Sequence, residues 1–249
     1  MKFITLFLLA ATVAAQPRFE VATIKPAEPG NLKGVRGGCR GIDSKSRGDN
    51  ADIPLGRCVI SDGRLSHMIT AAWQLKEVSM IQNAPDWVMG TDERYNLQAK
   101  AEDSHATEAQ LLVMLRQLLI DRFQLKFHME NREESGYALV VAKGGPKLEV
   151  SKDDDVTTLG PFNKASPTVT ISPRRATMAA LAQFLSTFGP GHVKDETGLD
   201  GFYNFRLTYN EAEGPSVFSA IQELGLRLES RKVPVTYFVI EAVQRPGDN

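Results

Sequence analysis

A chain of 249 residues, 42% of them hydrophobic, is long enough for one large domain or two small ones, each with its own core. The formal net charge of -1 gives no support to binding of nucleic acid or of an anionic membrane, which would need a clustered basic face. Aromatic and branched aliphatic residues are too frequent for an intrinsically disordered chain.

Residues 1–15 have the pattern of a signal peptide. Lys2 gives a positive start, residues 3–11 form a mostly apolar run, and residues 13–15 are small. We therefore expect cleavage after Ala15 and a mature protein that is periplasmic or secreted. The run is too short to span a bilayer, which takes about 20 apolar residues, and we expect no membrane span in the mature chain. An uncleaved N-terminal anchor is the alternative.

Export decides how the two cysteines, Cys39 and Cys58, are interpreted. In an oxidising compartment a Cys39–Cys58 disulfide is the natural pairing, and free or buried thiols are the alternative. Two lone thiols make a poor metal site, because zinc needs further ligands nearby. We expect the disulfide to hold a long loop at residues 27–57, which is rich in Gly, Asp, Arg and Ser and shows little periodicity.

The predicted elements begin with a strand at residues 19–25, where apolar and polar residues alternate before Pro26. After the loop, a first group of elements follows. It consists of a short strand at 58–61, a helix capped by Ser66, a half-buried strand at 95–101, a helix with a capping box of Thr107 and Gln110, and strands at 123–129 and 137–142.

A second group of elements repeats this order. It consists of a strand at 169–172, a helix capped by Thr177, an alternating strand at 203–209, a helix that starts near Pro215 and ends before Gly225, and strands at 226–229 and 235–240. Residues 92–97 align with 200–205, and residues 123–127 align with 224–228.

The repeated order predicts an α+β fold made by tandem duplication of a β-α-β-α-β-β unit, with antiparallel or mixed sheets and helices packed on one face. The alternative is that two unrelated α+β halves look alike at this level. The predicted organisation is a signal peptide at 1–15, an N-terminal strand and disulfide-held loop at 16–57, a first repeat at 58–150, a linker at 151–168 and a second repeat at 169–249.

No residue type in this sequence forms a recognisable catalytic, cofactor-binding or metal-binding pattern. The four histidines, His67, His105, His128 and His192, have no zinc-motif spacing, and we expect surface or hydrogen-bonded roles for them. There is no G-x-S-x-G elbow. We therefore predict no catalytic residues, no cofactor and no metal.

Weaker candidates for a binding site are two charged, glycine-rich segments and four aromatic residues. The segment GVRGGCRG at 34–41 can cradle an anion but lacks the features of a P-loop, and KDETGLDG at 194–201 fits a turn better than a calcium loop. A ligand groove can be lined by Trp73, Trp87, Tyr95 and Tyr203, because such rings combine an apolar body with a polar edge. The alternative for these four is the hydrophobic core.

Four segments resemble a large paralogous group of exported, soil-associated proteins found mainly in Acidobacteria, a domain of unknown function. The similar segments are FEVATIKP at 19–26 and the stretches at 118–148, 193–207 and 215–246. The family pattern D-K-T-G-L-x-G-x-Y is matched near residue 195, except that Glu196 replaces the basic residue. The resemblance implies export and an α+β domain, and similar domains attached to membrane-embedded sensor metallopeptidases suggest a sensing or binding role. It provides no catalytic residues.

The leading functional hypothesis is therefore a non-catalytic extracytoplasmic binding or sensing module. Its expected partner is an envelope protein or peptide, bound by strand addition at an exposed sheet edge. One alternative is a hydrolase that acts on extracellular polymer or peptide through unidentified acids, for which a pocket with two convergent carboxylates would be the mark. Another alternative is a structural envelope protein.

Overall fold

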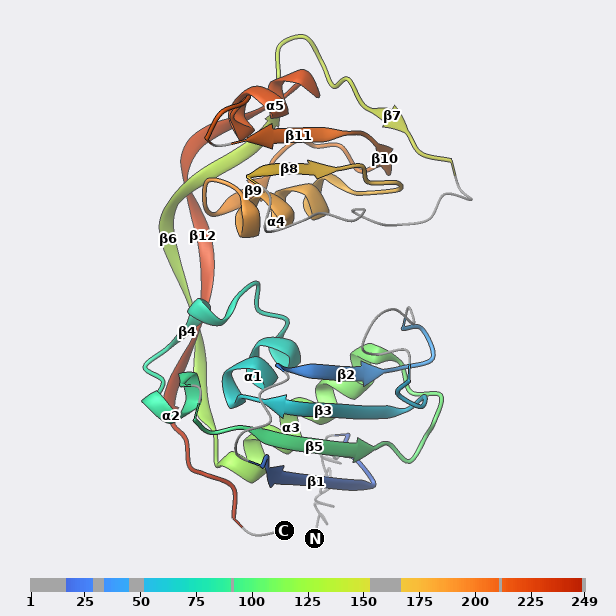
Figure 1. The fold of residues 1–249 in the computed structure, drawn as a ribbon, viewed down its shortest axis with the longest axis vertical. Coiled ribbons are helices and arrows are strands. Elements are labelled where there is room, and N and C mark those ends of the chain that lie inside the picture. The colour runs from blue at the N-terminus through green and yellow to red at the C-terminus, as the bar shows by residue number, and fades with distance from the viewer. Residues whose placement is uncertain are drawn as a thin grey trace, which may run out of the picture. The chain divides into compact units, whose positions relative to one another are not determined.

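The computed structural model describes residues 17–28, 34–44, 52–90, 92–152, 167–210 and 212–247. The predicted signal peptide at 1–15, and most of the predicted linker at 151–168, lie outside the described residues. The described chain is a mixed α+β protein with five α-helices, which confirms the predicted fold class. It divides into two compact units, unit 1 (Met1–His128 and Phe238–Asn249) and unit 2 (Met129–Tyr237) (Figure 1).

Unit 1 is built on an antiparallel four-stranded sheet of order β1-β5-β3-β2. Its elements are β1 (Val21–Pro26), β2 (Arg36–Arg40), β3 (Arg57–Gly63), α1 (Leu65–Trp73), the 3₁₀ helix η2 (Val78–Met80), β4 (Ile81–Gln82), α2 (Asp86–Met89), β5 (Tyr95–Lys100) and α3 (Glu108–Phe123). Along β5, Tyr95, Leu97 and Ala99 are buried, whereas the residues between them are exposed. This alternation turns one face of the sheet toward α1 and α3 and leaves the other face open.

Two of the predicted helix caps lie at the N-termini of helices in unit 1. The Thr107–Gln110 capping box of α3 is confirmed, with both reciprocal hydrogen bonds present. The predicted Ser66 cap is wrong. Helix α1 begins at Leu65 with Arg64 as its N-cap residue, and Ser66 lies inside the first turn with its side chain fully buried. The Met68 N–H donates to the carbonyl of Arg64 at 3.2 Å, so the helical hydrogen bonds begin before Ser66.

The N-terminal segment is more ordered than the predicted loop at 27–57, because β2 lies within it. The predicted disulfide is confirmed: Cys39 on β2 is directly opposite Cys58 on β3 and bonded to it. Gly37 has a φ of 95°, and a Cβ at this position would lie 2.0 Å from the carbonyl oxygen of Val59. The glycine and the disulfide together bring β2 close to β3, which periodicity alone could not predict.

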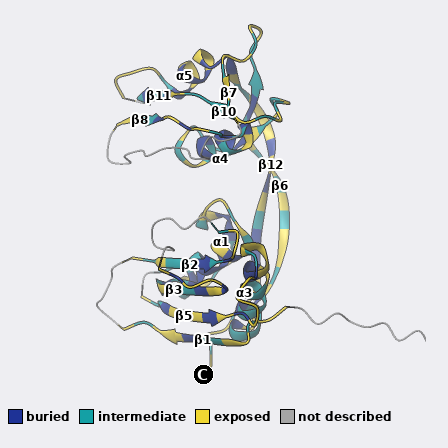
Figure 2. Ribbon diagram, turned by 90° about the vertical axis from the view of Figure 1, so that its right-hand side faces the viewer, coloured by how far each residue is buried: buried dark blue, intermediate teal, exposed yellow. Residues whose placement is uncertain are grey.

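Unit 2 has its own sheets and core. Its elements are β7 (Glu149–Val150), β8 (Thr168–Ile171), α4 (Met178–Phe188), β9 (Val193–Asp195), β10 (Tyr203–Asn204), β11 (Leu207–Asn210) and α5 (Val217–Glu223). Strand β8 pairs with β11, and β7 pairs with β10, both antiparallel. The predicted cap Thr177 accepts a hydrogen bond from the backbone of Ala180, and Gly225 with a φ of 70° follows α5 as expected. In both units, buried residues lie where helices meet strands (Figure 2).

Two long strands, β6 (Lys126–Val141) and β12 (Leu226–Ala242), replace the predicted pairs of short strands. The sequence predicted a break in each strand because the middle residues are polar. In the structure these residues are largely exposed and continue the two neighbouring strands. They bond from one strand to the other, as Thr236 Oγ1 does to Asn131 Oδ1 at 2.7 Å. Each strand starts in one unit and ends in the other. The compact units therefore divide the chain at 128 and 237, whereas the predicted repeats divide it at 150–168.

In both units, the end of a long strand pairs in parallel with a short strand. In unit 1, Phe238 of β12 pairs in parallel register with Ile81 of β4. In unit 2, Tyr137 of β6 pairs in parallel register with Val193 of β9. In each unit, one end of a long strand thus pairs in parallel with a short strand of the same unit.

A side-chain-to-backbone contact also recurs. Asn96 Oδ1 accepts from the backbone N–H of Asp62 at 3.0 Å, and Asn204 Oδ1 accepts from the N–H of Arg175 at 2.9 Å. Asp62 and Arg175 both adopt the left-handed conformation, with φ of 57° and 53°. The two asparagines occupy equivalent positions in the predicted alignment. The tandem duplication stays a prediction, and these contacts are in keeping with it.

We predict that Asn204→Ala removes the protection of the Arg175 amide from hydrogen exchange and destabilises unit 2 by about 1 kcal/mol, because a strained backbone N–H loses its acceptor. Asn204→Asp keeps an acceptor and should retain protection. Arg206→Ala, an exposed change nearby, is the control. Equal protection in Asn204→Ala and wild type would contradict the role given to this amide oxygen.

Removing the disulfide by Cys39→Ala with Cys58→Ala should lower the free energy of unfolding by roughly 3 kcal/mol, because it frees a loop closed between residues 19 positions apart. Chemical unfolding with and without reductant measures the difference. Reductant should destabilise the wild type and leave the double variant unchanged.

Candidate functional site

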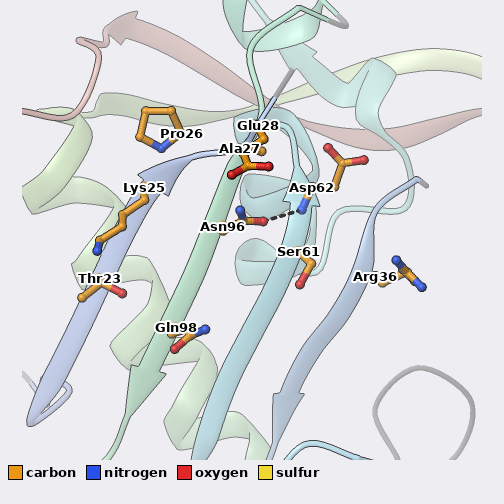
Figure 3. A pocket seen from close by; sticks show the side chains of 10 residues that line it. All are labelled: Thr23, Lys25, Pro26, Ala27, Glu28, Arg36, Ser61, Asp62, Asn96 and Gln98. Carbon is orange, nitrogen blue, oxygen red and sulfur yellow. Dashed lines mark hydrogen bonds between the residues drawn. The ribbon is translucent and has the colours of Figure 1, made fainter. Parts of the chain in front are cut away.

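The open face of the unit 1 sheet carries a hollow of about 460 Å³. Side chains from all four strands and from the turn after β1 surround it (Figure 3). The lining residues are Thr23, Lys25, Pro26, Ala27, Glu28, Arg36, Ser61, Asp62, Asn96 and Gln98. All ten are charged, polar or small, so the hollow offers hydrogen bonds and charges, and its volume lies within the roughly 300–1,000 Å³ of ligand pockets.

The hollow is lined by two cations and by the carboxylates of Glu28 and Asp62, and further cations follow along the strands of this face. Lys25 and Arg36 line the hollow, and the register places Arg57 between Lys100 and Arg40 on adjacent strands. Like charges directly opposite on a sheet repel one another. Lys100 is partly neutralised by Glu20 at 2.6 Å. The row of cations therefore favours a ligand that brings negative charge.

The carboxylate of Asp62 is already engaged at the edge of the hollow. Arg94 Nη1 lies 3.4 Å from Asp62 Oδ2 and donates to the Asp62 carbonyl at 3.1 Å, and both side chains are largely buried. His67 lies nearby on α1, 3.0 Å from Arg64. Burial, followed by the charges of Arg64 and Arg94, lowers the pKa of His67, so the imidazole is neutral at pH 7. It acts as a partner of Arg64.

A second hollow of about 230 Å³ in unit 1 contains an arginine held between a carboxylate and an indole ring. Arg245 Nε lies 2.9 Å from one oxygen of Glu93, and its Nη2 bonds to the other oxygen at 2.5 Å. The guanidinium carbon lies 5.0 Å from the centre of the Trp87 ring. Tyr95 donates its hydroxyl to Glu93 at 3.2 Å. The guanidinium is thus held by two hydrogen bonds to one carboxylate, by the opposite charge of that carboxylate and by the face of an indole ring.

The ionisation of these groups reflects the same contacts. The hydrogen bond from Arg245 is the largest of the influences that lower the pKa of Glu93. Burial, assisted by the negative charge of Glu93, raises the pKa of Tyr95 to about 12. At neutral pH the site thus holds a carboxylate and a neutral phenol.

The structure brings only part of the predicted aromatic groove together. Trp87 stacks on Phe123 at 6.5 Å, and Tyr95 meets the same ring edge-on at 5.4 Å. Trp73 instead packs edge-on against Phe127 and Phe238, at 4.9 Å from each. Tyr203 belongs to β10 of unit 2. A groove lined by all four stays a prediction.

The remaining predicted segments have structural contacts. Residues 34–41 contain β2, and in the segment 194–201 the carboxylate of Asp195 accepts from Thr197, which makes a turn. Glu196, which departs from the family pattern, pairs with Lys194 and with Arg231. Over the described ranges, no group of three His, Cys, Asp or Glu side chains comes together that could hold a metal ion.

Comparison with known protein families gives a match over most of the chain. Residues 66–243 match the model of the family described as Protein of unknown function (DUF3738). The chain belongs to the DUF3738 family. Searches of curated proteins and of solved structures found no match.

In this DUF3738 chain the family match includes α1 from its second residue, β5 and both long strands, but starts after β1, β2 and β3. The open-face hollow is therefore formed partly by β5 from the matched region and partly by N-terminal strands outside it. No helix in the described part of the chain is long and apolar enough to cross a membrane.

Sequence reasoning missed both hollows. The alternation in 95–101 already placed Asn96 and Gln98 on a polar face, so two of the ten lining residues of the first hollow had a local signal. The second depends on Glu93 and Arg245, which are 152 residues apart, and no local pattern connects them.

The ion pair of Glu93 should depend on pH with a definite sign. Because folding lowers the pKa of Glu93, its contribution is complete above the ordinary value of 4.5 and is lost as the pH falls through the lowered value. An NMR titration of the Glu93 side-chain carboxyl measures this. Arg245→Ala should move the midpoint upward, and an unchanged midpoint would show that the pair does not form in solution.

Proposed function

We propose that this DUF3738 protein is a non-catalytic binding module that works outside the cytoplasm. Export is supported by the apolar leader at residues 3–11, by the resemblance to exported soil-associated proteins, and by the Cys39–Cys58 disulfide, a bond that persists in oxidising compartments. The observation that carries the binding role is the 460 Å³ hollow on the open face of the unit 1 sheet.

The proposed ligand is an acidic peptide segment of another envelope protein. Thr23, Ser61, Asn96 and Gln98 offer hydroxyl and carboxamide groups that can bond peptide amides and carbonyls. The cations of the face pair with carboxylates, which gives charge complementarity. The lining is suited to a peptide because it presents hydrogen-bonding and charged groups without a ring platform for stacking.

Strand addition, the expected binding mode, requires an exposed strand at the edge of a sheet. At β1, Arg122 donates to the carbonyl of Ala22 at 3.3 Å, and Pro26 has no N–H. These features blunt β1 as an acceptor of a partner strand. Strand β8 lies at the edge of its two-stranded sheet with β11, and it is the proposed acceptor if the partner also adds a strand.

The hydrolase alternative has its acids in the same hollow, where Glu28 and Asp62 both line the wall. Asp62 holds Arg94 and a strained turn, which supports a structural role for its carboxylate. Binding is therefore the function we propose, and the carboxylates are tested with it.

The test measures binding of fluorescent decapeptide pools to the mature protein by anisotropy. One pool is rich in Asp and Glu, and the other carries Asn and Gln instead. We expect the acidic pool to bind more tightly and to weaken with added salt. Lys25→Ala with Arg36→Ala should weaken it about tenfold or more, since each lost charge-assisted contact costs about 1.5–3 kcal/mol.

Matched controls use exposed cations elsewhere: Lys126→Ala and Arg206→Ala should bind like the wild type. Equal affinity for the two pools, or an unaffected double variant, would refute the proposed ligand. Loss of the acidic pool by cleavage, abolished by Glu28→Gln with Asp62→Asn, would favour the hydrolase. A folded protein that binds neither pool would favour a structural envelope role.

A further inference from the structure

We propose that Trp87, Glu93 and Tyr95 form a binding site for the guanidinium group of an arginine side chain, and that Arg245 occupies this site as an internal ligand. An arginine-bearing peptide would displace Arg245 and take its place. This inference concerns the second hollow and does not rest on the proposed acidic ligand of the open face.

The first argument is the chemistry of the contacts. Arg245 presents two nitrogens to the two oxygens of Glu93, and its guanidinium carbon lies 5.0 Å from the centre of the Trp87 ring. A planar fork on a carboxylate combined with a cation over an aromatic face selects guanidinium over ammonium. The site is therefore specific for arginine rather than for any cation.

The second argument is that the site is held in place by residues other than Arg245. Tyr95 is buried, packs edge-on against Phe123, and donates its hydroxyl to Glu93. Trp87 stacks on the same Phe123 ring. Carboxylate and indole thus keep their positions when the arginine leaves, and a preformed site does not have to be ordered by its ligand.

The third argument is that Arg245 is bound weakly enough to be replaced. It follows the end of β12 at Ala242, and its side chain is 60% exposed although paired with Glu93. Ion pairs this exposed contribute little to stability because water screens both charges. The preceding residue stays anchored, because the Gln244 N–H donates to the carbonyl of Phe123 at 2.7 Å. Displacement thus requires only a side-chain movement at the end of a fixed strand.

The hollow of about 230 Å³ next to the guanidinium leaves space for the rest of a ligand. Its lining consists of Glu93, Tyr95 and Arg245 together with Pro26, Ala27, Asp92, Arg94 and Pro246. Asp92 and Arg94 add one charge of each sign. Pro26 and Ala27 also line the open-face hollow, so the two binding surfaces adjoin. A peptide of mixed charge can therefore place carboxylates on the open face and an arginine here.

The experiment uses N-acetyl-arginine methylamide as the probe, with the lysine and citrulline analogues as controls for fork and charge. Trp73→Phe leaves Trp87 as the only tryptophan reporter. In that background, Arg245→Ala should show a saturable change in fluorescence with the arginine probe and bind it at least about tenfold more tightly than either control. Adding Glu93→Gln should abolish the response, and Lys126→Ala should leave it unchanged.

A second arm keeps the native chain and follows the Arg245 Nε–H resonance by NMR. The arginine probe should shift this resonance at higher concentration than it needs in Arg245→Ala, because it must compete with the internal ligand. If the probe produces no saturable change in Arg245→Ala and no shift in the wild type, the contact is a structural clamp only and the proposal is wrong. If Arg245→Ala unfolds, the native-chain arm decides alone. Binding here without binding of the acidic pool, or the reverse, separates this proposal from the proposed function.

Discussion

Phe238 is fully buried in the core of unit 1, although the strand that carries it begins in unit 2. Leu139 is fully buried in the core of unit 2, on a strand that begins in unit 1. Burying side chains of this size contributes roughly 1.5–3 kcal/mol each relative to exposure. Each core thus includes a residue of a long strand that begins in the other unit.

Because the end of β12 lies in the core of unit 1, the residues that follow β12 lie next to the candidate site. Once Phe238 and Ile240 have entered the core of unit 1, the residues that follow lie against α3, where Gln244 bonds to the end of the helix. Arg245 then meets Glu93. The position of the internal arginine is therefore a consequence of how β12 completes the sheet, and it links unit 1's second hollow to the strand that comes from unit 2.

Local patterns in the sequence predicted the elements well and their connections poorly. The Thr107 and Thr177 caps and the alternation of β5 were confirmed, because each rests on residues within one turn or one strand. The two long strands were predicted as four, since exposed residues such as Asn131 carry no apolar alternation. A pair of strands in which neither face is buried has no apolar periodicity for sequence analysis to detect.

The candidate site divides in the same way. Asn96 could be assigned to a polar face from alternation, but only the pairing of β1 with β5 shows that it lies beside Lys25. The aromatic residues Trp87 and Tyr95 were selected for their chemistry, and their meeting on Phe123 depends on tertiary packing. No local sequence pattern could predict the Glu93–Arg245 pair, because its two residues are 152 positions apart.

Both hollows of unit 1 are lined by cations and carboxylates together. The open face places Lys25 and Arg36 beside Glu28 and Asp62, and the second hollow places Asp92 and Glu93 beside Arg94 and Arg245. Opposite charges on adjoining surfaces discriminate among ligands, since a peptide must present its own charges in the matching order to satisfy both. In the proposed binding role, Arg245 neutralises Glu93 until an arginine of the bound peptide replaces it. The order of charges along the two hollows would then favour one direction of the bound chain over the other.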